Sequence, residues 1–448
     1  MLPCTHEKDP RDEHHPAAHR SIRIPGARQG NGGSTVRTIA EHREAVSALL
    51  AATLRPREEL LDLTSGRDLA AACGDRVLAH AVVAAVDVPP FDNSQMDGFA
   101  VRSSDLDRPG VRLPLASEVA AGTVPGPLPP RTAAPIMTGA PMPDGADAVI
   151  PVERTNGSFA DATTAGAVSF AAPVEPGTYV RQRGSDVVAG SILFSDGTVL
   201  GAAQLGALVA AGVSAVPVVA LPRVALVTTG LELTPAGTPL AAGQIHDSNQ
   251  IMLAHALRRS GAQVTQHGYH SDEPAGFLEL VTGLARTSDL IVTTGAVSRG
   301  TREVVRESLE GRSVTFESVA MQPGGPQGSG TVDSPHGAVP IICFPGNPVS
   351  ALVSFEMFLR SDLRRFTGLR PADRVALSVP LAHAVEPLTG KHQIRRGVLD
   401  ADGNASVVGG PGSHLLTAYA RSTVLIHLPA GDSELPPGTP VDVWRIDD

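Results

Sequence analysis

Lysine, cysteine and aromatic residues are all scarce in this 448-residue sequence. Aromatics make up 3% of the chain, so valine, leucine and alanine must fill its cores. The three cysteines, Cys4, Cys73 and Cys343, lie far apart without short metal-ligand spacing. This spacing argues against a disulfide framework or a zinc site and fits a reducing compartment. Lysine occurs only as Lys8 and Lys391, so arginine carries nearly all of the positive charge.

Long apolar runs are also absent. No run approaches the roughly twenty apolar residues of a membrane span, and the N-terminus lacks the basic-then-apolar layout of a signal peptide. The net charge of −10 gives no general attraction for polyanions, and the arginines form no basic stripe interleaved with aromatics. We therefore expect a soluble, cytoplasmic protein that binds neither a membrane nor nucleic acid.

The rest of the composition indicates a folded protein with several domains. Apolar residues make up 42% of the chain, and 448 residues exceed the size at which a single core keeps growing. Within the first ordered part, apolar residues recur at helical spacing from about Thr38 to Leu54. Changes of pattern predict a disordered tail (1–35), a discontinuous N-terminal helical and linker domain (36–70 and 180–219), a mostly β module (71–179), an α/β domain (220–368) and a small C-terminal β domain (369–448).

After Pro222, short apolar runs alternate with helical stretches, which is typical of a parallel sheet covered on both faces. The runs expected to be strands are 224–227, 262–264, 290–292 and 340–344, and the expected helices are 249–259, 275–286, 302–309 and 349–366. The predicted fold class is therefore α/β plus β in a multidomain chain.

Three of these strand ends carry glycine turns. In a parallel sheet, ligands bind beyond the carboxyl ends of the strands, where glycines let the backbone approach and helix N-termini offer amides to anions. Each turn alone is a weak signal, because many such turns carry glycine and a cap. The residues expected to bind substrate here are Gly230, Gly295, Ser298, Gly346, Asn347, Pro348 and Ser350.

Acidic residues follow the same turns. Glu232, Asp272 and Glu303 would repel an anionic ligand unless a divalent cation lay between, and Mg²⁺ is commonly held by carboxylates together with phosphate oxygens. Alternatively, Asp272 and Glu303 only favour the N-termini of the helices that follow them.

Five ordered motifs resemble those of the molybdopterin molybdenumtransferases of the MoeA type, a family that includes the E domain of gephyrin. The resemblance extends from about Ile39 to Leu428. The motifs are Phe91-Asp92-Asn93-Ser94-Gln95-Met96-Asp97-Gly98-Phe99-Ala100-Val101-Arg102, Ile136-Met137-Thr138-Gly139-Ala140-Pro141, Gly145-Ala146-Asp147-Ala148-Val149, Arg183-Gly184-Ser185-Asp186 and Pro345-Gly346-Asn347-Pro348-Val349-Ser350-Ala351.

The resemblance implies a homodimer of elongated four-domain subunits. Each has a molybdopterin-binding α/β domain similar to MoaB and Mog and a small C-terminal domain resembling a β-barrel. The active cleft would combine the α/β domain of one subunit with the β module of the other. The implied catalytic residues are Asp97, Asp186, Glu232, Asp272 and Glu303, of which the last three also hold Mg²⁺; Thr138 and Gly139 bind substrate, and Pro323, Arg395 and Ser413 bind molybdate.

Two of these assignments have simpler alternatives: Asp97 as a turn-capping aspartate and Arg395 as a surface ion pair. The sequence also departs from the family at three lysine positions, which here are Ser318, Gln322 and Gly325. The milder departures are at Pro135, Leu231, Ala296 and Glu303.

Loss of the lysines removes positive charge from a site for two anions. We predict that Arg299 or Arg302 replaces part of it, against the alternative that Arg302 and Arg306 pair with nearby glutamates on a solvated helix face.

The expected activity is insertion of molybdate into adenylylated molybdopterin with release of AMP, assisted by Mg²⁺. A catalytically degenerate binding or scaffold paralogue is the alternative, and adenylylation of molybdopterin is a weaker third option. The expected protein partners are the adenylyltransferase that supplies the substrate and the apo-molybdoenzymes that receive the cofactor.

Overall fold

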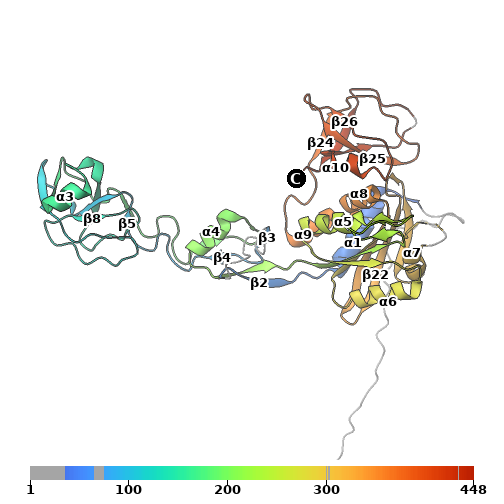
Figure 1. Ribbon diagram of the computed structural model, residues 1–448, viewed down its shortest axis with the longest axis horizontal. Helices are drawn as coiled ribbons and strands as arrows, with labels where there is room; N and C mark the ends of the chain where they lie inside the picture. Colours follow the sequence, from blue (N-terminus) through green and yellow to red (C-terminus); the bar gives the residue numbers. More distant parts are fainter. Residues whose placement is uncertain (1–35, 65–74, 299, 301–302, 432, 448) are drawn as a thin grey trace, which may run out of the picture.

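The chain is elongated, with a compact end and a narrow arm (Figure 1). The computed structural model describes residues 36–64, 75–298, 300, 303–431 and 433–447. The expected tail, Cys4, Cys73, Arg299 and Arg302 lie outside these residues. None of the helices in this described part has the length and apolar character that a membrane span requires.

The compact end is built on a seven-stranded sheet. In spatial order its strands are β1 (Val36–Arg37), β20 (Val314–Val319), β22 (Pro326–Ser334), β23 (Gly337–Phe344), β19 (Leu290–Thr294), β15 (Arg223–Thr229) and β18 (Gln263–Tyr269). The last four are mutually parallel, as predicted, whereas β22 is antiparallel to both of its neighbours. The pattern of short apolar runs did not reveal β20 and β22, because glycine and polar residues fill much of β22.

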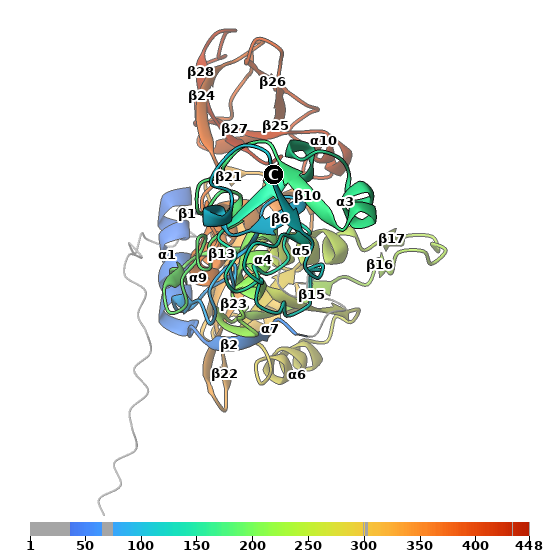
Figure 2. The same cartoon turned by 90° about the vertical axis from the view of Figure 1, so that its left-hand side faces the viewer.

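Helices cover both faces of this sheet (Figure 2). One face carries α1 (Ile39–Thr53), α5 (Ser248–Arg259), α8 (Pro348–Phe358) and α9 (Arg360–Thr367), and the other carries α6 (Pro274–Leu284) and α7 (Val304–Leu309). Alternate residues of one strand serve the two layers: Leu226 lies in the first core, and Ala225 and Val227 lie in the second. The single helix expected over 349–366 is two helices that meet at Leu359.

The predicted N-terminal helix is α1, and Thr38 caps it in a capping box with Glu41. The sequence pattern groups this helix with segment 180–219. In the structure, however, Val46 and Leu50 of α1 share a core with Phe355 of α8, so α1 packs on the α/β domain.

The inner part of the arm has its own small core, which includes Leu78, Leu208 and Val218. Its strands pair as β2 (Glu58–Asp62) with β14 (Ala215–Val219), β3 (Arg76–Val77) with β13 (Val199–Leu200) and β4 (Val82–Val83) with β12 (Ile192–Phe194), and its helix is α4 (Ala202–Ala210). Segment 76–83 thus pairs with 192–200, although the sequence pattern assigned it to the β module.

The tip of the arm is the β module (Figure 1). Its elements are β5 (Asn93–Ser94), β6 (Gly98–Val101), β7 (Val111–Pro114), β8 (Ala134–Ile136), β9 (Ala148–Pro151), α3 (Phe159–Ala165), β10 (Ala167–Phe170) and β11 (Val180–Arg181). Two cores fill it, one around Phe99 and Phe170 and one around Ile136 and Val149.

The C-terminal part is a six-stranded sheet joined to the α/β domain. Its elements are β21 (Met321–Gln322), β24 (Ala376–Pro380), β25 (His392–Leu399), β26 (Ala405–Val407), α10 (Leu416–Ala420), β27 (Val424–Leu428) and β28 (Pro440–Arg445). Because β21 pairs with β25, and Met321 and Val353 share a core with Ile394 and Leu425, the two parts form one packed unit.

Candidate functional site

A pocket of about 590 Å³ opens at the carboxyl ends of β15, β19 and β23. It brings together all of the residues that the sequence placed at the strand-end turns and all three acids that follow them. The predicted residues that line it are Gly230, Glu232, Asp272, Gly295, Ser298, Glu303, Gly346, Asn347, Pro348 and Ser350.

Strand order explains why the pocket lies here. The chain runs from β15 to β18 on one side and then to β19 on the other, so the two crossovers diverge between β15 and β19. The turns after these strands are packed closely. Gly295 has a φ of 101°, and a Cβ atom there would lie 2.6 Å from the carbonyl oxygen of Thr229. Only glycine fits this turn.

The sequence did not single out the hydrogen bonds that hold these turns together. Asn249, buried in the first turn of α5, donates its amide to Thr294 Oγ1 at 3.1 Å and to the carbonyl of Gly346 at 2.7 Å. Asp247 caps α5 through the amide of Gln250 and accepts the hydroxyl of Thr228 at 2.5 Å. The signal available was Asp247 before a helical run, an N-cap pattern directly after the short parallel strands β16 (Leu233–Thr234) and β17 (Ile245–His246).

The three acids differ in their surroundings. Glu232 and Asp272 are exposed at the rim of the pocket. Glu303 is the N-cap of α7, and its carboxylate accepts hydrogen bonds from the hydroxyl of Ser298 and from the amides of Ser298 and Gly300 at 3.1 Å. Throughout the residues described, no group of three or more His, Cys, Asp or Glu side chains is arranged to hold a metal ion. The acids therefore line one pocket without forming a closed metal cage.

The N-terminus of α8 forms the wall of the pocket at β23. Asn347 is the N-cap residue and Pro348 follows it, as predicted. One amide of this first turn is already used, because Val349 N donates to the carbonyl of Ser413 at 3.2 Å.

The three residues assigned to molybdate do not line the pocket, and two of them lie on segments that contact α8. Ser413 contacts α8 through its carbonyl. Pro323 follows β21, and the loop after it is held by Gln327, whose amide donates to the carbonyl of Gly324 and to Ser354 Oγ of α8 at 2.7 Å. Arg395 lies on β25, the partner of β21.

Arg395 has two buried nitrogen atoms, Nε and Nη1, without a hydrogen-bond partner among the described residues. Burial lowers the pKa of Arg395, because desolvation disfavours its charged form. The simpler alternative of a surface ion pair does not apply, since no ion pair of Arg395 is found in the described structure. A guanidinium in this state would gain from an anion.

The predicted site residues of the β module lie at the opposite end of the molecule from the pocket (Figure 1). Asp97 and Thr138 are neighbours there: the Asp97 carboxylate accepts the amide of Thr138 at 2.7 Å and its hydroxyl at 2.8 Å. These two bonds lower the pKa of Asp97. They also agree with the turn-capping alternative. Gly139 continues this turn with a φ of 80°, and Asp186 is exposed nearer the inner part of the arm.

One of the three positions where the resemblance predicts lysine holds a neutral contact. Gln322 accepts a hydrogen bond from the amide of Gln393 at 2.8 Å, which fastens β21 to β25. Arg306 pairs with Glu310 at 2.6 Å, as the alternative predicts, but its side chain is only 17% exposed, so it does not lie on a solvated face.

Three family models match the chain. They are the MoeA N-terminal region (domain I and II) over residues 37–212, a probable molybdopterin binding domain over 225–365 and the MoeA C-terminal region (domain IV) over 378–446. The strand-end pocket thus lies inside the domain that the probable molybdopterin binding model matches.

Whole-chain relatives agree with these models. Molybdopterin molybdenumtransferase 2 of Mycobacterium tuberculosis is 39% identical over 92% of this chain and 100% of its own length. The molybdopterin molybdenumtransferase of Synechococcus elongatus is 36% identical over 83% of this chain and 92% of its own length. A crystal structure of the molybdopterin biosynthesis MoeA protein from Pyrococcus horikoshii superposes with a TM-score of 0.69 at 27% identity, covering 92% of this chain and 99% of that one.

The chain therefore belongs to the MoeA family of molybdopterin molybdenumtransferases. The resemblance expected from the five motifs, and with it the fold class, is confirmed.

Proposed function

We propose that the chain inserts molybdate into adenylylated molybdopterin and releases AMP, with the strand-end pocket as the substrate site. The observation that carries this proposal is the convergence of three glycine turns and the N-terminus of α8 on one pocket in the domain matched by the molybdopterin-binding model. Backbone at such turns approaches phosphate groups closely, and helix N-termini favour negative charge.

Molybdate would bind beside this pocket, at Arg395. The buried Arg395 donors that have no partner among the described residues suit a tetrahedral oxyanion, since a planar guanidinium offers paired N–H groups to neighbouring oxygens. Pro323 and Ser413 lie on the segments that connect this position to α8 and to the pocket. Molybdate is a substrate here, delivered to a dithiolene that the pocket holds in place.

Mg²⁺ fits the pocket only as an ion shared between protein and substrate. Glu232, Asp272 and Glu303 all line the pocket, and these acids would hold the ion together with phosphate oxygens. When bound, Mg²⁺ would neutralise charge on the pyrophosphate and so ease its cleavage. The turns of this chain would hold the phosphates. The carboxylates would contact the phosphates only through the ion between them.

We further propose that the working site needs a second copy of the chain. Asp97, Thr138 and Asp186 are carried on the arm, away from the pocket of the same chain (Figure 1). A closed twofold dimer would place the arm of one subunit against the pocket of the other. The chain would act in the cytoplasm and pass its product to apo-molybdoenzymes.

Turnover by purified protein tests the activity. The protein is incubated with adenylylated molybdopterin, Mg²⁺ and molybdate, and AMP release is measured together with activation of an apo-molybdoenzyme. We expect AMP release that depends on molybdate. Tight binding of the pterin without such release would overturn the enzymatic proposal and leave a binding protein. Transfer of AMP from ATP would instead indicate an adenylyltransferase.

A further inference from the structure

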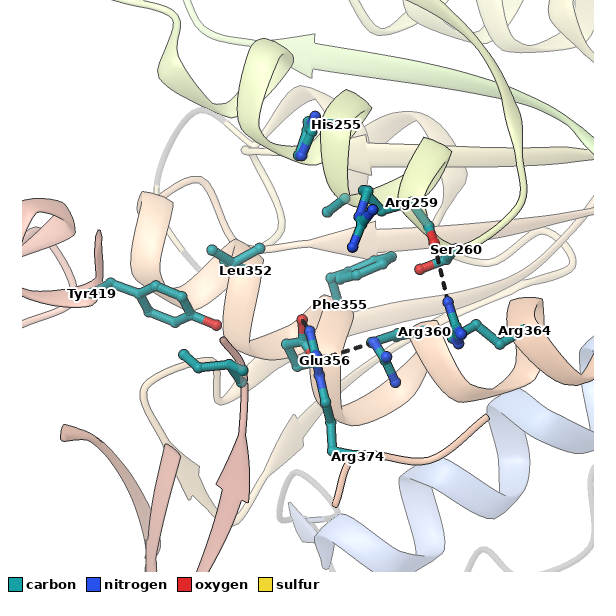
Figure 3. Close-up of a pocket in the computed structure, with 12 residues that line it drawn as sticks. His255, Arg259, Ser260, Leu352, Phe355, Glu356, Arg360, Arg364, Arg374 and Tyr419 are labelled. Carbon is teal, nitrogen blue, oxygen red and sulfur yellow. Dashed lines mark hydrogen bonds and ion pairs between the residues drawn. The ribbon is translucent and has the colours of Figure 1, made fainter. Parts of the chain in front are cut away.

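A second pocket, of about 180 Å³, lies among the helices α5, α8 and α9, which cover the same face of the sheet. It is at the C-terminal end of α5, beside the C-terminal part (Figure 3). Four arginines line it, Arg259, Arg360, Arg364 and Arg374, together with the single carboxylate of Glu356. We call it the arginine pocket. It is far smaller than the strand-end pocket, and no residue lines both.

The carboxylate of Glu356 is already engaged. It accepts two hydrogen bonds of 2.9 Å from Nε and Nη2 of Arg374, and Arg360 Nε lies 3.8 Å from it. Glu356 and Arg360 are both almost completely buried. One carboxylate faces two guanidinium groups here, so this buried group carries a net positive charge, and it forms the base of the pocket.

The other two arginines, Arg259 and Arg364, have no carboxylate partner among the described residues. Arg364 donates from Nε to the carbonyl of Pro371 at 2.9 Å and from Nη1 to the carbonyl of Arg259 at 3.2 Å, both neutral acceptors. For the side chain of Arg259, the described residues provide neither a hydrogen bond nor an ion pair. Figure 3 shows Arg259 and His255 entering the pocket from α5, opposite α8 and α9.

The acids around the pocket do not change this balance. Asp373 is paired with Arg365 at 2.6 Å and Asp447 with Arg445 at 2.8 Å. Asp75 acts on Arg364 only at a distance. Burial lowers the pKa of Arg360 to about 10, and repulsion from Arg374 adds to this effect. The guanidinium groups thus lie close enough to repel one another.

A purely structural role explains only part of the arrangement. Arg364 is suitably placed to offset the partial negative charge at the C-terminus of α5, which amounts to about half an elementary charge. That role also suits Arg259, which stands in the last turn of α5, but it requires no pocket, and it leaves the guanidinium groups of Arg259 and Arg364 beside a carboxylate that is already taken.

We propose that the arginine pocket binds the phosphate group of a small anion between Arg259 and Arg364. Its volume fits the head group alone, so the remainder of a larger ligand would project into solvent. The planar N–H forks of two arginines are the common means of holding a phosphate. This site is independent of the proposed catalytic pocket and of the reaction there.

Titration calorimetry with inorganic phosphate, at constant ionic strength, tests the proposal. We expect Arg259→Gln to weaken binding about tenfold, as the loss of one charge-assisted contact does. Arg258→Gln is the matched control, because it removes the same charge from the neighbouring exposed position of α5, which does not line the pocket. It should leave the affinity unchanged. Arg364→Gln should weaken binding as Arg259→Gln does.

Glycerol 3-phosphate in the same titration separates a free anion from a phosphomonoester, because the tighter ligand identifies which is recognised. Equal affinity of wild type and Arg259→Gln for phosphate would overturn the proposal. So would loss of phosphate binding in Arg395→Gln but not in Arg259→Gln, since the anion would then lie at the candidate molybdate position. AMP release without added phosphate should be the same in wild type and Arg259→Gln, so the fate of this site does not depend on that of the proposed reaction.

Discussion

The compact end of the molecule and the tip of its arm hold their predicted site residues in different ways. In the α/β domain, residues from several distant segments meet in one pocket. In the β module, Asp97 and Thr138 bond to each other, at the opposite end of the chain from that pocket. Within one chain, the fold therefore brings together only the pocket residues of the proposed site. The remaining residues lie on the β module at the tip of the arm, which has its own cores.

The largest expected effect tests the half that is assembled. Asp272→Asn and Glu232→Gln should each lower kcat/KM by about a hundredfold or more, because each removes a charge that would hold Mg²⁺ against the phosphates. Both residues are exposed, so circular dichroism and thermal unfolding should not change. Glu279→Gln, an exposed acid on α6 outside the pocket, is the matched control. Near-normal rates in both pocket variants would refute the assignment.

The second prediction tests whether the two halves come from different chains. Inactive Asp97→Asn and Asp272→Asn proteins, once mixed and allowed to exchange subunits, should recover about a quarter of wild-type activity. Half of the dimers would then be mixed, and each of these would have one intact site. Mixing Asp97→Asn with Thr138→Ala should restore nothing, since both changes are on the arm. Proven exchange without recovery in the first mixture would show that the site lies within one chain.

The α/β half was predictable because its geometry is general. Parallel strands end at one edge of a sheet, so Gly230, Gly295 and Gly346 had to converge once their strands were recognised. Glu303 shows the limit of this reasoning: it lines the pocket, yet its carboxylate is bound by Ser298 and Gly300, a contact that spacing alone does not reveal.

Packing between distant segments could not be predicted from local pattern. Asn249 links two strand-end turns through side-chain bonds, and α1 joins the α/β core rather than the segment next to it in sequence. Both depend on tertiary contacts. The molybdate residues were placed by resemblance, and the structure adds that Arg395 has buried donors without described partners.

The third prediction is that lowering the pH destabilises the compact end but not the β module. Burial lowers the pKa of His427 from 6.5 to about 3. The unfolded chain therefore binds a proton below pH 6.5 that the folded chain refuses until about pH 3. The contribution of His427 to the free energy of unfolding is therefore fully present above pH 6.5 and is lost as the pH falls. Between pH 7 and pH 5 this one group should lower the free energy of unfolding by about 2 kcal/mol.

The β module, residues 93–181, contains no histidine, so its unfolding should not share this loss. Urea unfolding at pH 7 and pH 5, followed by hydrogen exchange in each region, measures both. His427→Leu should flatten the dependence in the compact end. An equal loss in wild type and variant would mean that His427 is not responsible.

The smallest expected effect concerns Arg395, which we assign to the binding of molybdate. Arg395→Ala should raise the molybdate concentration for half-maximal AMP release about tenfold while leaving pterin affinity unchanged, because it removes one charge-assisted contact to the oxyanion alone. Arg421→Ala, an exposed arginine of the same C-terminal part, is the control for charge. Gln322→Lys adds a cation at a position where the resemblance predicts a lysine, and it should lower the molybdate requirement if molybdate lies near β21. If Arg395→Ala changes nothing while Gln322→Lys improves activity, the oxyanion binds on the β21 side, and Arg395 is not part of the molybdate position.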